Sequence, residues 1–305
     1  MRQVTIEAAH KIMQSNPKSY FLVGDLGYHA VEAIEQEFPN RFINVGIAEQ
    51  DMIGIAAGLA LNGNKVFVYS IIPFLTMRPF EQIRNDLCYQ NLDVVLIGAG
   101  GGFAYGVLGP THFALEDIAI MRSLPNITIF SPADETEAVL QMNLAKHIKG
   151  PIYIRTGGRT APKIFDKRYD LKLGKGKIMC EGEDVWIIAT GPILGEAIEA
   201  AKEFAKKKIK IGVVNMHTLK PFDKKLVASI SGKSKLIVTL EEHFIAGGLG
   251  SLVAEVMAED HGTARLIRMG VDDRFMKEVA TTDKYARKIL GLDAMGIIQK
   301  IKENL

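Results

Sequence analysis

The chain has 305 residues, of which 48% are hydrophobic and 24% charged, and its formal net charge at pH 7 is +2. This length exceeds one ordinary compact core and predicts two α/β domains. The small net charge, with Lys and Arg scattered among Asp and Glu, argues against nucleic acid or a membrane as a partner. Cys88 and Cys180 fit no disulfide or metal pattern, and no signal-peptide-like apolar stretch opens the chain. We therefore expect a cytoplasmic protein.

Short apolar, β-branched runs alternate with amphipathic stretches along the first half of the chain. The expected strands are Tyr20–Val23, Arg41–Val45, Lys65–Ser70, Asp93–Ala99, Ile127–Phe130 and Pro151–Arg155. Helices are expected between them, as at Ile47–Leu61 and Asp134–His147. This alternation predicts right-handed crossovers and a mostly parallel sheet with helices on both faces.

The pattern breaks after Arg155 and then resumes. We expect a first domain over residues 1–165, a linker over 166–182 and a second α/β domain over 183–305. The strands expected in the second domain are Asp184–Thr190, Ile209–Asn215, Lys235–Glu241 and Ala264–Met269. A last helix is expected around Ala294–Glu303. The predicted fold class is thus two three-layer α/β domains with mostly parallel sheets.

Glu49 lies at the start of the helix expected over Ile47–Leu61. Taken alone, it is an ordinary first-turn acid that interacts favourably with the helix dipole. The segment Phe42-Ile-Asn-Val-Gly-Ile-Ala-Glu-Gln-Asp-Met-Ile-Gly-Ile-Ala-Ala-Gly-Leu-Ala60, however, resembles the segment of transketolases and deoxyxylulose-phosphate synthases that binds the aminopyrimidine of thiamine diphosphate. The family's catalytic glutamate falls on Glu49. The resemblance implies that its carboxyl group bonds a ring nitrogen and favours the imino tautomer, which takes the proton from the thiazolium carbon.

The resemblance also implies an aromatic ring that stacks on the aminopyrimidine shortly after the strand Val66–Ser70. Phe74 is the candidate for this cofactor contact, and a core Phe beneath the next helix is the alternative. Tyr69 and Arg78 are expected to line the same cofactor-binding loop, because ligands sit at the carboxyl ends of parallel strands.

The next segments carry candidates for the reaction itself. Gly98–Gly102 lacks the Lys and Ser/Thr of a P-loop and is expected to be flexible backbone beside the active site. Gly106-Val-Leu-Gly-Pro-Thr-His112 is similar to the family's Asp-Gly-Pro-Thr-His, which places a catalytic histidine on His112; a surface or capping histidine is the alternative. Leu108 stands where the family has an acidic residue that contacts a sugar hydroxyl. Pentose phosphates, the usual substrates, are therefore in doubt.

Two arginines and a C-terminal motif complete the resemblance, which runs from about Thr5 to the end of the chain. Arg155 matches a family arginine that holds the sugar phosphate, and Arg159 is a second candidate; a structural salt bridge is the alternative for both. The second half, including the string from Val238 to Ser251, is similar to the family's C-terminal domain, which supports fold and dimerisation. The Glu-Glu-His triplet of residues 241–243 is therefore expected to be a structural turn rather than a metal site.

Half of the family's active site has no counterpart here. Family members hold the diphosphate through Mg²⁺ with a Gly-Asp-Gly motif and a later Asn, and the nearest string, Gly24-Asp-Leu-Gly27, lacks the middle glycine. The resemblance thus implies the C-terminal subunit of a split transketolase. It would be active only with an N-terminal subunit that carries the diphosphate and magnesium site, in an α2β2 heterotetramer, while the chain alone could form an inactive dimer.

The implied reaction is the transfer of a two-carbon ketol unit between a ketose and an aldose, with a sugar or sugar phosphate as substrate. The alternatives are a deoxyxylulose-phosphate synthase fragment, the β subunit of a 2-oxoacid dehydrogenase, and a catalytically idle assembly subunit.

Overall fold

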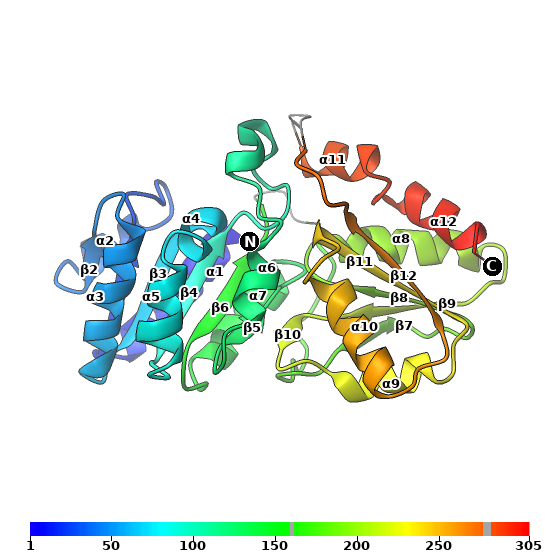
Figure 1. Ribbon diagram of the computed structural model, residues 1–305. Helices are drawn as coiled ribbons and strands as arrows, with labels where there is room; N and C mark the ends of the chain where they lie inside the picture. The colour runs from blue at the N-terminus through cyan, green and yellow to red at the C-terminus, as the bar shows by residue number, and fades with distance from the viewer. Residues whose placement is uncertain (159–161, 277–281, 305) are drawn as a thin grey trace. The chain divides into compact units, whose positions relative to one another are not determined.

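The computed structural model describes residues 1–158, 162–276 and 282–304. The chain divides into two compact units. The first comprises Met1–Gly101 and Ile120–Leu171, and the second comprises Gly102–Ala119 and Lys172–Leu305. In each unit helices cover both faces of a central sheet (Figure 1), which confirms the predicted fold class. Among the described residues, no helix has both the length and the apolar character needed to cross a membrane.

The sheet of the first unit is parallel, with its strands in the order β5-β6-β4-β3-β1-β2. These strands are β1 (Ser19–Val23), β2 (Phe42–Asn44), β3 (Lys65–Ile71), β4 (Val94–Ala99), β5 (Thr128–Phe130) and β6 (Ile152–Thr156). Each begins and ends within one residue of the strand expected from the sequence. The agreement follows from their nearly continuous apolar runs, which are typical of strands buried on both faces.

The helices of this unit cover both faces of the sheet, so the two faces of β3 contact different helices. They are α1 (Arg2–Ser15), α2 (Glu32–Glu37), α3 (Glu49–Leu61), α4 (Ile72–Thr76), α5 (Phe80–Gln82) with the π-helical turn Ile83–Cys88, α7 (Glu135–Ala145), and α6 (Asp117–Arg122), which leads the chain back from the second unit. Phe67 and Tyr69 of β3 point into the core that α1 and α7 help to form. Strand alternation turns Ser70 to the opposite face, which α3 covers.

The second unit contains a sheet in the order β12-β11-β8-β9-β7, parallel except for β7. Its strands are β7 (Lys177–Cys180), β8 (Val185–Ala189), β9 (Ile211–Asn215), β11 (Leu236–Phe244) and β12 (Arg265–Val271), and the short strand β10 (Thr218–Lys220) follows β9. Its helices are α8 (Leu194–Ala205), α9 (Lys224–Ser231), α10 (Leu249–Glu259), α11 (Asp283–Ile289) and α12 (Ala294–Lys302). Helices α8 and α12 pack together, as do α9 and α10, and the two pairs cover opposite faces of the sheet (Figure 1).

Strand β7 lies inside the range 166–182, for which the sequence suggested only a linker. It pairs antiparallel with β9, with Ile178 opposite Val214. Its four residues, Lys-Ile-Met-Cys, lack the β-branched run that identified the other strands. An edge strand this short carries little sequence signal.

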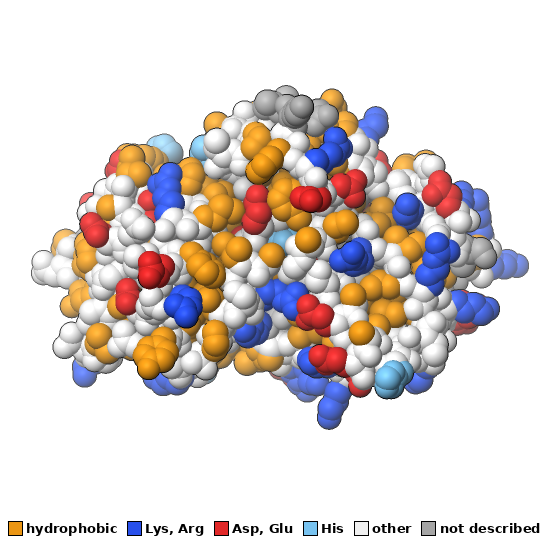
Figure 2. Space-filling model, viewed as in Figure 1, with side chains coloured by type: hydrophobic (Ala, Val, Ile, Leu, Met, Phe, Trp, Pro, Cys, Tyr) orange, Lys and Arg blue, Asp and Glu red, His pale blue; other side chains and the backbone are white. Residues whose placement is uncertain are grey.

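The charged side chains are interspersed, as the composition suggested. On the face drawn in Figure 2, Lys and Arg side chains alternate with Asp and Glu, with apolar side chains between them.

Candidate functional site

Helix α3 begins at Glu49, with Ala48 as its N-cap. The carboxyl group is buried, since Glu49 is only 3% exposed, and an isolated buried charge would be costly. Three features compensate for this cost. The start of the helix favours a negative charge. Ser70 Oγ donates to Glu49 Oε1 at 3.4 Å, and Arg78 Nη1 donates to Glu49 Oε2 at 2.8 Å. The carboxylate therefore lies at the carboxyl end of β3 with a cation beside it.

Asn44, the last residue of β2, fixes the turn that precedes Glu49. Its Oδ1 accepts hydrogen bonds from the backbone N–H groups of Asp25 and Gly46, each at 3.0 Å. Its Nδ2 donates to Asp25 Oδ1 at 3.3 Å. A Cβ built on Gly24 would lie 3.7 Å from Glu49 Oε1, so the loop after β1 passes close to the carboxylate. Asn44 and Ser70 were missed from the sequence, where the available signal was a polar residue near the carboxyl end of an apolar strand.

Phe74 and Arg78 come together with Glu49. Phe74 lies on α4 and is half-buried, and the guanidinium carbon of Arg78 is 4.0 Å from the centroid of its ring. The same guanidinium group forms the ion pair with Glu49. The planar cation of Arg78 thus contacts both the aromatic ring of Phe74 and the buried carboxylate of Glu49. We call these residues, together with Ser70, the Glu49 cluster.

Tyr69 lies on the other side of the sheet. It is 1% exposed and belongs to the core beside α1, because neighbouring residues of a strand point to opposite faces. A Cβ on Gly27 would lie 3.2 Å from its ring. The role of Tyr69 in cofactor binding stays a prediction.

The glycines of Gly98–Gly102 make room for close packing. A Cβ on Gly101 would lie 3.0 Å from Nη1 of Arg155, which is 2% exposed on β6. The backbone N–H of Gly101 donates to the carbonyl oxygen of Thr156 at 2.9 Å. The expected flexible backbone is thus a hydrogen-bonded segment whose missing side chains let Arg155 approach. The phosphate-binding role of Arg155 stays a prediction, and Arg159 lies outside the described residues.

Leu108 and His112 belong to the second unit. Leu108 lies in the 3-10 segment Gly106–Thr111 and is 51% exposed. His112 follows this segment, and its Nδ1 is 2.9 Å from Oγ1 of Thr111. Tyr105 contacts the imidazole edge to face, with ring centroids 6.2 Å apart. These contacts orient the ring, while the roles of His112 and Leu108 in the reaction stay predictions.

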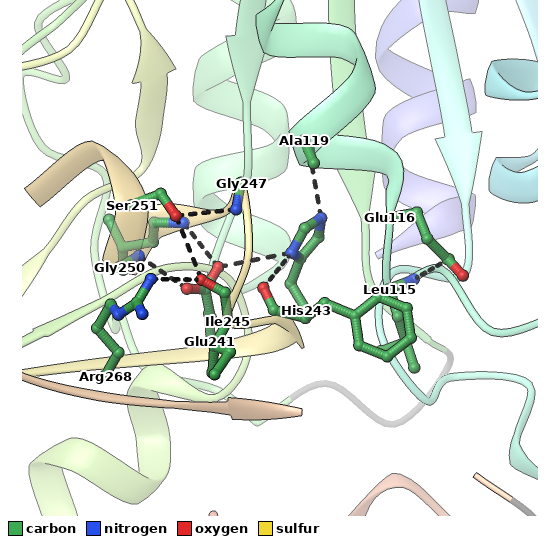
Figure 3. Close-up of polar contacts among 12 residues, drawn as sticks. Leu115, Glu116, Ala119, Glu241, His243, Ile245, Gly247, Gly250, Ser251 and Arg268 are labelled. Atoms are coloured by element: carbon green, nitrogen blue, oxygen red, sulfur yellow. Dashed lines mark hydrogen bonds and ion pairs between the residues drawn. The ribbon is translucent and has the colours of Figure 1, made fainter. Parts of the chain in front are cut away.

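The segment 102–119, which carries both residues, is attached to the end of β11 (Figure 3). The backbone N–H of Phe244 donates to the carbonyl oxygen of Leu115 at 2.9 Å. The backbone N–H of Ala119 donates to His243 Nε2 at 3.3 Å, and His243 Nδ1 lies 2.7 Å from the carbonyl oxygen of Phe244. Because Nε2 accepts, we assign the proton to Nδ1, so His243 acts as a neutral clamp on this segment.

The neighbouring carboxylates of β11 support the fold of the second unit. Glu241 accepts hydrogen bonds from the backbone N–H groups of Leu249 and Gly250, both at 2.7 Å, at the start of α10. Glu242 is paired with Arg287 at 2.8 Å, and both side chains are buried. These contacts give Glu241 and Glu242 structural partners within the unit.

Burial shifts the pKa values of two side chains in the second unit. It lowers the pKa of His217 to about 4; His217 is 1% exposed, and its Nδ1 lies 2.8 Å from Thr218 Oγ1. Burial also raises the pKa of the Glu116 carboxyl group, which accepts a hydrogen bond from the backbone N–H of Leu115 at 3.1 Å.

Most of the chain matches two domains of one protein family. Residues 1–162 match the transketolase pyrimidine binding domain, and residues 174–296 match the transketolase C-terminal domain. The chain belongs to the transketolase family. This confirms the resemblance seen around Glu49. Members of the family are transferases, and membership implies thiamine diphosphate as the cofactor.

Three members of the transketolase family show how much of the chain is shared. The chain is 38% identical over 263 residues to an apulose-4-phosphate transketolase subunit of Actinobacillus succinogenes, covering 86% of this chain and 84% of that protein. It is 36% identical over 304 residues to a 6-deoxy-6-sulfo-D-fructose transketolase subunit of Clostridium sp. (strain MSTE9), covering 99% and 94%. A solved structure described as a split gene transketolase, inactive beta4 tetramer, superposes with a TM-score of 0.88 at 36% identity, covering 99% and 97%.

Proposed function

We propose that the chain is the C-terminal subunit of a split transketolase-like enzyme that transfers a two-carbon ketol unit between a ketose and an aldose. The buried carboxylate of Glu49 carries this proposal, because it lies at the carboxyl end of a parallel sheet and is paired with Arg78, whose guanidinium group lies over the ring of Phe74. Two similar proteins are named as transketolase subunits for apulose 4-phosphate and 6-deoxy-6-sulfo-D-fructose, which supports a sugar as the substrate class.

The residues present fit the aminopyrimidine half of thiamine diphosphate. Phe74 offers a ring for stacking, and Glu49 offers a carboxylate that is 3% exposed and able to share a proton with a ring nitrogen. When bound, the cofactor supplies the carbon nucleophile that breaks and forms the carbon–carbon bond next to a carbonyl. Glu49 would hold and move the proton at its carboxyl oxygen. His112 would donate a hydrogen bond near the reacting carbonyl, and Arg155 would bind a substrate phosphate.

The other half of the cofactor site is assigned to a separate N-terminal subunit that carries the Gly-Asp-Gly motif and Mg²⁺. In the nearest string of this chain, Asp25 is hydrogen-bonded to Asn44 and braces the turn before Glu49. The 36% identical split gene transketolase forms a tetramer described as inactive, which supports self-association of such chains without activity. A heterotetramer with two copies of each subunit is the assembly we propose.

The side chain of Leu108 favours a substrate other than the usual pentose phosphates. Leu108 is apolar and 51% exposed, at the position where the family has an acid that contacts a sugar hydroxyl. An apolar side chain cannot accept that hydrogen bond, so a substrate that lacks or displaces the hydroxyl would be tolerated better.

Reconstitution tests the proposal. The chain is mixed with an N-terminal transketolase subunit, thiamine diphosphate and Mg²⁺, and ketol transfer is measured with a panel of ketose donors and aldose acceptors. We expect activity that falls by at least about 100-fold in Glu49→Gln, since general acid–base groups typically contribute this much. Glu35→Gln, an exposed acid of α2, is the matched control and should leave the rate unchanged.

Two outcomes would oppose the proposal. An assembled complex that transfers no ketol unit from any sugar of the panel would remove the reaction. Full activity in Glu49→Gln, with assembly intact, would make the chain a catalytically idle assembly subunit.

A further inference from the structure

Arg78 makes, within one chain, the two contacts that the aminopyrimidine is proposed to make. Its guanidinium group is planar and lies 4.0 Å from the centroid of the Phe74 ring. Its Nη1 donates to Glu49 Oε2 at 2.8 Å. Stacking on Phe74 and a hydrogen bond to Glu49 are the contacts by which these two residues would hold the cofactor ring.

We propose that Arg78 is a placeholder, which occupies the position of the aminopyrimidine in the cofactor-free chain and leaves that position when the cofactor binds. This inference rests on the proposed function, because the ligand it concerns is the cofactor ring. It adds that the side chain of Arg78 and the cofactor ring compete for Phe74 and Glu49. Glu49 therefore becomes available to the cofactor only when Arg78 leaves.

Arg78 and the ring cannot make these contacts at the same time. A ring stacked on the same face of Phe74 would lie about 3.5–4 Å from it, in the layer that the guanidinium group now fills. The guanidinium group also fills the lone-pair position of Glu49 Oε2 to which its Nη1 donates at 2.8 Å. Binding of the ring therefore requires Arg78 to move.

The surroundings of Arg78 allow this movement. Its side chain is 44% exposed, whereas the side chain of Glu49 is 2% exposed. The guanidinium group can thus turn to water, where its charge is well solvated, while its apolar stem stays on the protein. Met77, the C-cap of α4, precedes Arg78, so the side chain extends from a helix end rather than from a packed helix interior.

The exchange also keeps a donor beside the buried carboxylate. An unpaired carboxylate at the position of Glu49 would be costly, and only Ser70, at 3.4 Å, among the other members of the Glu49 cluster donates to it. In the free chain Arg78 supplies the additional donor. In the bound state a ring nitrogen that shares a proton with the carboxyl group takes its place. The apparent affinity for the ring is lowered by the fraction of chains in which Arg78 is in place.

A binding measurement on the isolated full chain tests this. The probe is 4-amino-5-hydroxymethyl-2-methylpyrimidine, the cofactor ring without the thiazolium and diphosphate, so the N-terminal subunit is not required. Its dissociation constant is measured by ligand-observed saturation-transfer NMR for the native chain, Arg78→Met and Arg84→Met. Arg84 is the matched control, because it is exposed and donates to Asn85.

We expect Arg78→Met to bind the probe roughly tenfold more tightly than the native chain, as removal of a cation–π contact and a partly exposed ion pair implies. Arg84→Met should bind like the native chain. Adding Glu49→Gln to Arg78→Met should cancel the gain. Unchanged or weaker binding by Arg78→Met, or no detectable binding, would overturn the placeholder, because the position should be open in this variant.

A second variant, Arg78→Lys, tests the proposal even if Arg78→Met does not fold. Arg78→Lys keeps the charge but loses the flat guanidinium group that stacks on Phe74, so its dissociation constant should also be lower than that of the native chain. Weaker binding than native would overturn the inference. Ketol transfer in the reconstituted complex is a separate readout: its absence removes the proposed function, whereas tighter probe binding by Arg78→Met would still support the placeholder.

Discussion

Replacing Arg78 by Met in the cofactor-free chain should lower the free energy of unfolding of the first unit by about 1 kcal/mol. Breaking a fully buried ion pair costs about 3–5 kcal/mol, whereas an exposed pair is worth at most about 1 kcal/mol. The side chain of Glu49 is 2% exposed, but that of Arg78 is 44% exposed, so solvent screening places this pair near the lower value. Ser70 and the start of α3 continue to stabilise the carboxylate, which keeps the loss well below that of a fully buried pair.

The assay must separate the two units. Cys88 is buried in the first unit, so its reactivity with a thiol reagent across a urea series, in a Cys180→Ser background, reports unfolding there. Trp186, the single tryptophan, reports the second unit by its fluorescence. Arg78→Met should lower the urea midpoint seen at Cys88 and leave that seen at Trp186 unchanged.

A double-mutant cycle with Glu49→Gln isolates the pair. The coupling free energy between the two substitutions should be about 1 kcal/mol, because either single substitution already removes the ion pair between Arg78 and Glu49. Additive effects, or a loss of equal size in Arg84→Met, would refute the stabilising contact between Arg78 and Glu49.

Three further outcomes are expected. The lowered pKa of His217, about 4 against 6.5 for the ordinary group, means that the unfolded chain binds more protons below pH 6.5, so stability should fall between pH 6.5 and 4 and then level off. By pH 5 the loss should be about 2 kcal/mol, and an equal pH slope in the urea unfolding of His217→Asn would contradict it. Glu241→Gln should lower the stability of the second unit by about 2 kcal/mol, since one of the two N–H groups at the start of α10 loses a charged acceptor. Unchanged urea unfolding would show that water can replace the carboxylate as the acceptor. Gly101→Ala should displace Arg155 and raise KM for phosphorylated sugars more than it lowers kcat, and an unaltered KM would separate Arg155 from substrate binding.

The main elements could be predicted because their sequence signals are local. Lys65–Ile71 is a buried strand whose apolar run identifies it without any knowledge of its neighbours. The helix from Glu49 was expected two residues early, since the apolar residues Ile47 and Ala48 precede its true start. Helix ends depend on capping geometry, which a run of apolar letters does not fix.

The contacts of the Glu49 cluster could not be predicted in the same way. The ion pair of Glu49 and Arg78 joins residues 29 positions apart and depends on the conformation of a long side chain. Tyr69 and Ser70 must face opposite ways, but β3 is buried on both faces, so its pattern does not say which residue faces α3. The sequence suggested that Tyr69 lined the loop, whereas Ser70 donates to Glu49.

The path of the chain limits how such proteins can recombine. The segment 102–119 lies inside the stretch matched by the pyrimidine binding domain, yet it packs with the second unit. A genetic crossover in the region 163–173 would therefore join this segment to a foreign β11. The backbone contact between Leu115 and Phe244 needs only an N–H group at residue 244 and so tolerates any residue there except proline, whereas the clamp by His243 needs that side chain. A Cβ on Gly247 would lie 2.5 Å from that of Ala119, so these positions must be inherited as a matched set across the apparent domain border.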